Sequence, residues 1–103
     1  DSAYLEIARH LAERIIGQPG MADDRQRMAH AFQMVVSRKA STRELETLLE
    51  LYRAELARFE QNPEIASEAL GKTSVAAADQ PRLAAWFSIA NVLLNLDETI
   101  TKG

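Results

Sequence analysis

The residues of this chain that could do chemistry are few and stand apart from one another. The only histidines are His10 and His30, and neither belongs to an H-E-x-x-H array or a similar metal-binding motif. His10 has Glu6 and Glu13 on neighbouring helical turns, so a surface hydrogen bond explains it more simply than a metal ion, which would need a third ligand. We therefore expect no metal site in this chain.

Two neighbouring carboxylates near the end of the chain, Asp97 and Glu98, could suggest acid–base catalysis. Adjacent residues of a helix point about 100° apart, so these carboxylates do not converge on one substrate atom. They also lie where the helix dipole disfavours negative charge, and a salt bridge would offset that. We expect structural salt bridges here, with Arg38, Lys39 or Arg82 as the candidate partners.

The sequence offers no activated nucleophile. Ser41 and Thr42 stand where a helix cap is expected, without a base that would activate a hydroxyl. The chain has no cysteine, which removes disulfides, thiolate metal ligands and covalent haem attachment. We therefore predict no catalytic, cofactor-binding or metal-binding residue in this chain.

Length and composition indicate one globular domain. The chain has 103 residues, 47% hydrophobic and 26% charged, which is close to the globular average. Its net charge of −3 argues against nucleic acid and anionic membranes as partners, and no apolar run reaches the roughly 18 residues of a membrane span. The sequence shows no signal peptide and no initiator Met, so we expect residues 1–103 to be a single domain from the C-terminal part of a larger protein.

Hydrophobic residues recur at helical spacing, and nothing alternates as a strand does. The pattern predicts an all-α fold, a compact bundle of four main helices plus one short helix. Asp23 with Gln26 and Ser41 with Glu44 match capping boxes, and Gly17 suits the position after a helix end. The predicted helices cover residues 2–16, 24–39, 42–61, 63–70 and from 79 or 80 onward, with a surface loop over 72–80.

The helical spacing also predicts which side chains face inward. In the second helix, Arg38 and Lys39 are expected in the last turn, where they complement the helix dipole. The predicted inner faces are Leu5, Ala8, Leu11, Ala12, Ile15 and Ile16; then Met28, Ala31, Phe32, Val35 and Val36; then Leu45, Leu48, Leu49, Tyr52, Leu56 and Phe59.

The last helix is apolar around nearly its whole circumference, which is typical of a helix that others surround. We therefore predict that it is the central helix of the bundle. Its polar residues Ser88, Asn91 and Asn95 fall with Ala84 on one narrow stripe. The stripe has three interpretations: it faces solvent or a loop, it pairs inside the domain, or it contacts another domain. These three polar residues are the candidate contact site.

The second and third helices, joined by SRKAS, have the layout of a DNA-binding helix-turn-helix. The helix that would enter the groove is strongly acidic, so phosphates would repel it. Its acidic residues are Glu44, Glu46, Glu50, Glu55 and Glu60. We therefore expect no nucleic-acid partner.

Two stretches of the chain together resemble a known family. They are RMAHAFQMVVSRKASTRELETLLELYRAELARF and LAAWFSIANVLLNLDETITKG, and they resemble the C-terminal end of the planctomycete-specific-domain family of unknown function. One departure is Ala40, where the family prefers proline. The matching positions are Arg27, Ala31, Phe32, Val35, Arg38, Glu44 and Leu45, then Leu93, Leu94, Asn95, Asp97, Glu98 and Thr99.

The resemblance implies a context and no established activity. Members are long, usually exported proteins that often carry cytochrome-c-like domains, so any haem would lie in another domain of the parent. The first functional hypothesis is a non-catalytic helical module that packs against other domains of an exported protein. The second is a wall of an active site whose hydrolytic or redox chemistry lies in other domains. The third is homo-oligomerisation through leftover apolar surface.

Overall fold

The computed structural model describes residues 2–102, and the side chains of residues 3–98. The described residues form helices and contain no strand. The elements are α1 (Ser2–Gly17), α2 (Asp24–Val36), α3 (Thr42–Gln61), α4 (Pro63–Leu70), the short 3-10 helix η1 (Ala77–Asp79) and α5 (Gln80–Lys102). The predicted all-α class and the predicted count of helices are confirmed.

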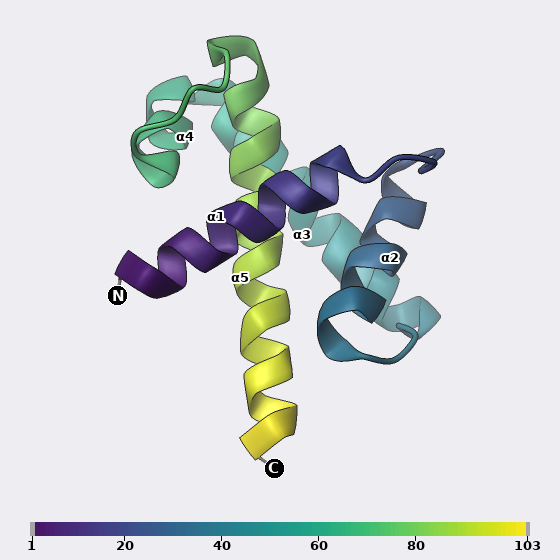
Figure 1. Ribbon diagram of the computed structural model, residues 1–103. Helices are drawn as coiled ribbons and strands as arrows, with labels where there is room; N and C mark the ends of the chain where they lie inside the picture. Colours follow the sequence, from purple (N-terminus) through teal and green to yellow (C-terminus); the bar gives the residue numbers. More distant parts are fainter. Residues whose placement is uncertain (1, 103) are drawn as a thin grey trace.

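α5 is the central helix, as its apolar circumference predicts. It contacts every other helix, and Figure 1 shows α1 crossing one side of it while α3 passes on the other. α4 packs near its N-terminal end, and its C-terminal turns extend away from the crossing point (Figure 1). The largest side chains that are fully buried are Trp86, Phe32, Phe59, Ile15, Met28, Leu70, Ile89 and Leu93.

α3 and α4 have the predicted boundaries because local signals fix them. The Ser41 hydroxyl accepts a hydrogen bond from the Glu44 backbone N–H at 3.1 Å, and the Glu44 carboxylate accepts one from the Ser41 N–H at 2.8 Å. This reciprocal pair is the predicted capping box. Pro63 begins α4 at a position that needs no N–H donor, and Gly71 ends it with a φ of 69°.

α2 ends three residues earlier than predicted. Ser37 takes the left-handed conformation with a φ of 65°, and its N–H bonds to the Gln33 carbonyl. A serine in this region is uncommon, so composition alone does not signal the stop. Arg38 and Lys39 therefore lie outside α2, and Arg38 instead forms a two-bond ion pair with Glu44, at 2.9 Å for each bond.

The connection between α1 and α2 also differs from the prediction. Gly17 is still helical, and the Arg27 guanidinium closes the end of α1 by donating to the Ile15 and Ile16 carbonyls at 2.8 and 3.0 Å. Asp23 caps α2, but the Gln26 side chain accepts from the N–H of the preceding Ala22, so the predicted box is displaced by one residue.

The predicted inner faces hold for most positions and are wrong at Leu5. Its side chain is 51% exposed because this end of α1 lies at the edge of the bundle. The predicted loop over 72–80 contains η1 and the first residue of α5. Several predicted inner residues are only half-buried, namely Leu11, Ile16, Val35, Leu45 and Leu56.

Candidate functional site

The N-terminal part of the polar stripe faces α3. Ser88 is half-buried near Glu55, whose carboxylate bonds to Arg58 one turn further along α3, at 2.9 Å. The Arg58 guanidinium holds the pKa of Glu55 below its usual value, and the Ser88 hydroxyl adds to this effect. Ala84, the fourth member of the stripe, is fully buried. This part of the stripe therefore lies inside the domain.

The C-terminal part of the stripe lies beside the first turn of α1. Asn91 is half-buried, and its amide donates to the Phe87 carbonyl one turn back at 3.1 Å. The Tyr4 hydroxyl donates to the Asn95 side-chain oxygen at 3.0 Å and lies 3.4 Å from the Asn91 carbonyl. Asn95 itself remains exposed.

Beside Val92 and Leu96, an apolar hollow of about 640 Å³ opens between α3 and α5. Leu48 and Val92 lie at its base, and Leu96 at its edge is 39% exposed. The start of α3 forms its other wall, with Ser41, Arg43, Glu44 and Thr47. Leu96 thus departs from the expectation that neighbouring helices cover α5 all round.

The wall of this hollow carries the most perturbed carboxylate among the described residues. The Arg38 guanidinium and the Ser41 N–H hold the pKa of Glu44 at about 2, well below the ordinary 4.5. The carboxylate is therefore fixed as an anion and already accepts three hydrogen bonds, two from Arg38 and one from Ser41. It serves the helix cap and the ion pair and is not available as a general base.

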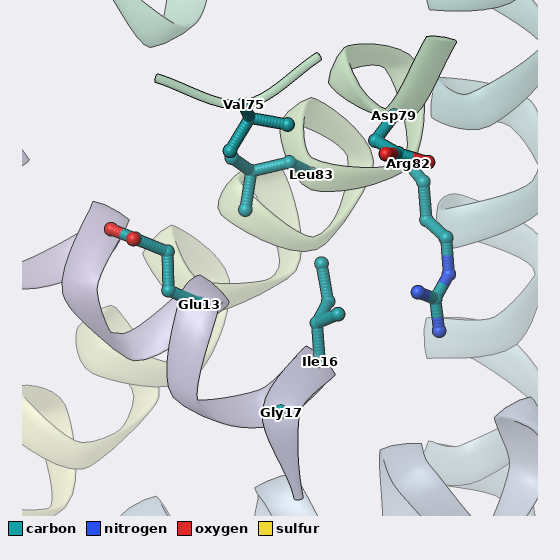
Figure 2. Close-up of a pocket in the computed structure, with 7 residues that line it drawn as sticks. All are labelled: Glu13, Ile16, Gly17, Val75, Asp79, Arg82 and Leu83. Atoms are coloured by element: carbon teal, nitrogen blue, oxygen red, sulfur yellow. The ribbon is translucent and has the colours of Figure 1, made fainter. Parts of the chain in front are cut away.

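A second depression, of about 380 Å³, lies between the end of α1 and the segment that leads into α5. Figure 2 shows Ile16, Val75 and Leu83 lining it, while the Glu13 carboxylate and the Arg82 guanidinium point away from that apolar patch in different directions. Because these charged groups do not converge, the depression lacks a constellation for acid–base chemistry.

The remaining sequence candidates are also dispersed. The His10 ring lies 3.9 Å from the Glu13 carboxylate, and both side chains are exposed, in agreement with the predicted surface contact. Within the described part of the chain, no group of three or more His, Asp or Glu side chains could hold a metal ion. Asp97 and Glu98 each have a partner inside the chain, whereas the Arg38 proposed for them pairs with Glu44.

Sequence reasoning missed Tyr4, Ile7 and the exposure of Leu96. Tyr4 reaches Asn95 across 91 positions of sequence, a contact that no local pattern encodes. Ile7 was detectable, because it is an apolar residue outside the predicted inner face of α1, and it is 56% exposed. An apolar residue that a helical face does not account for is a signal of exposed surface.

In comparisons with protein-family models, curated proteins and solved structures, no match to this chain was found. No helix among the described residues is long and apolar enough to cross a membrane. Fold and contacts together define a small all-α domain whose notable surfaces are apolar hollows beside α5.

Proposed function

We propose that this chain is a non-catalytic helical module that packs against other domains of a larger, exported protein. The observation that carries the proposal is Leu96, a large apolar side chain exposed at the edge of the hollow between α3 and α5. Exposed Asn95 is its neighbour on the same helix. An exposed apolar side chain next to an exposed polar one suits an interdomain contact, because such contacts are more polar than permanent interfaces.

The three polar residues take different parts in this proposal. Ser88 and Asn91 are half-buried; Ser88 lies near Glu55 of α3, and the Asn91 amide bonds to the Phe87 carbonyl within α5 itself. Asn95 is the exposed member of the stripe, and its side-chain oxygen accepts from Tyr4 of α1. The proposed contact surface is centred on Val92 and Leu96 and is bordered by Thr47 of α3.

The resemblance to the planctomycete-specific-domain family supports the exported, multidomain context. It rests on the phrase from Arg27 to Leu45 and on the phrase from Leu93 to Thr99, and Thr99 lies outside the described side chains. A haem or other cofactor would belong to the remaining domains of such a parent. The partner of the surface around Leu96 would then be one of those domains.

The test is reassembly in trans. The 103-residue chain is mixed with its parent protein lacking this segment, binding is measured by calorimetry, and the footprint by amide hydrogen exchange. We expect protection of the second part of α5 and of the start of α3. Leu96→Glu should weaken binding at least about tenfold, whereas Ile7→Glu, at a more exposed apolar position on another face, should not. Absence of any binding, or equal loss in both variants, would overturn the proposal.

A further inference from the structure

A second apolar face lies on the opposite side of α5 from Leu96's hollow, and it is built by three helices. We call it the α1–α2 trough and define it by Ile7, Leu11 and Arg14 of α1, Met34 and Val35 of α2, and Leu94 of α5. These residues line a hollow of about 400 Å³, together with His10 and Asp97. A neighbouring hollow of about 490 Å³ shares Arg14 and Met34, so the trough continues along the seam between α1 and α2.

The trough contains both a projecting side chain and a cavity. Ile7 is the most exposed large hydrophobic residue among the described positions, at 56%. Leu11, Met34, Val35 and Leu94 beside it are half-buried and leave the hollow open. Methionine adapts its shape to an incoming group, which makes such a hollow tolerant of the side chain it receives.

The trough carries one positive and one negative side chain, Arg14 and Asp97, at different positions along its length. Arg14 belongs to both hollows, whereas Asp97 lines only the first, at the α5 end. A strongly acidic or strongly basic partner would meet one of these two charges unfavourably. A surface with the same two charges in reversed order would meet both favourably.

We propose that the α1–α2 trough is the contact surface between two copies of this chain related by a two-fold axis. In such an interface each residue pair occurs twice, so the surface must be complementary to itself. Ile7 of each copy would enter the hollow of the other, and each Arg14 would lie opposite the other copy's Asp97. Asp97 also interacts within its own chain, and a carboxylate can accept bonds from more than one donor.

This proposal does not depend on the proposed function. The trough uses α1, α2 and the Leu94 side of α5, whereas the proposed interdomain surface uses α3 and the Leu96 side. A dimer would leave the second surface accessible. Failure of one proposal therefore leaves the other standing.

Sedimentation of the 103-residue chain from about 1 μM to about 1 mM covers the dissociation constants of weak and moderate complexes. We expect a reversible monomer–dimer equilibrium. Ile7→Glu should raise the dissociation constant at least about tenfold, and Leu96→Glu should leave it unchanged. Circular dichroism verifies that each variant keeps its helices. A monomer throughout the range would overturn the proposal, as would equal weakening by both substitutions.

A charge exchange tests the register of the two copies. Arg14→Glu alone and Asp97→Arg alone should each weaken the dimer, because each places like charges opposite one another. The double variant should recover most of the affinity of the original chain, since opposite charges again face each other with their positions exchanged. Additive weakening in the double variant would exclude the two-fold arrangement, and so would a double variant no stronger than either single one.

Discussion

The two parts of α5 both carry large apolar residues, and these residues have very different surroundings. Over residues 83–90 every side chain except Ser88 is buried. Over residues 91–98 only Leu93 is buried, although Val92, Leu94 and Leu96 are equally apolar. The first part lies where α1, α3 and α4 converge on it, and the second extends beyond that point (Figure 1). An apolar sequence therefore indicates that a helix packs against others. The lengths of those neighbouring helices determine where its burial ends.

The first part should contain the residue whose loss is most damaging. Trp86 is fully buried, with its ring centroid 4.5 Å from that of Tyr52. We expect Trp86→Ala to lower the free energy of unfolding by about 3–5 kcal/mol, because it removes a large packed side chain and leaves a cavity. Urea denaturation followed by circular dichroism measures this. A loss below that of Leu93→Ala would contradict the ranking of the two parts.

Leu93 tests whether the second part has any core of its own. It is the one fully buried residue there, so we expect Leu93→Ala to cost about 2–5 kcal/mol of unfolding free energy. Leu96→Ala is the matched control, since it removes the same atoms from an exposed position and should change stability by less than about 0.5 kcal/mol. If the same denaturation gave similar losses of unfolding free energy for the two leucines, their different exposure would not determine their contributions to stability.

Tyr4 tests how α1 holds the second part. Tyr4→Phe removes the hydroxyl that donates to Asn95 and keeps the ring, so we expect a loss of about 0.5–1.5 kcal/mol. Asn95→Ala should cost a similar amount, and the two losses should not add in the double variant because they break one bond. Full additivity in thermal unfolding would show that the bond contributes nothing.

The smallest effect at neutral pH is expected at the α3 wall beside Leu96, where an exposed ion pair holds the start of the helix. The pKa of Glu44 is about 2 in the folded protein and higher when unfolded, so its contribution is present above about pH 4.5 and is lost as the pH falls toward 2. The stability difference between the original chain and Glu44→Gln should therefore shrink over this window. Thermal unfolding at a series of pH values would detect it, and a gap that widened on acidification would refute this assignment.

Sequence was sufficient for α3 and α4, whose boundaries are determined by neighbouring residues. The Ser41–Glu44 box and the Pro63 start lie within one helical turn of the boundaries they fix, so α3 and α4 were predicted correctly. The end of α2 was not, because Ser37 adopts a left-handed backbone that its side chain does not require. The central position of α5 followed from its composition, since a helix apolar all round must be covered.

The candidate surface was only partly predictable for a different reason. The helical wheel placed Ser88, Asn91 and Asn95 on one side of α5, and the side chains of Asn91 and Asn95 are hydrogen-bonded within the domain. Asn95 bonds to Tyr4 of α1 and Ser88 lies near Glu55 of α3, and both helices are far away in sequence. Which polar residue stays exposed depends on where those helices pass, and that is a property of tertiary packing.

The Arg27 guanidinium, which closes the last turn of α1 from α2, has a consequence for how the domain tolerates change. It bonds to the backbone carbonyls of Ile15 and Ile16, and every residue type presents the same carbonyl there. Substitutions at positions 15 and 16 can therefore alter the packing of α1 without removing these hydrogen bonds to α2. Position 27 does not tolerate substitution in this way, because the hydrogen bonds depend on the long arginine side chain. The junction therefore tolerates substitutions at the end of α1 but depends on a single residue of α2.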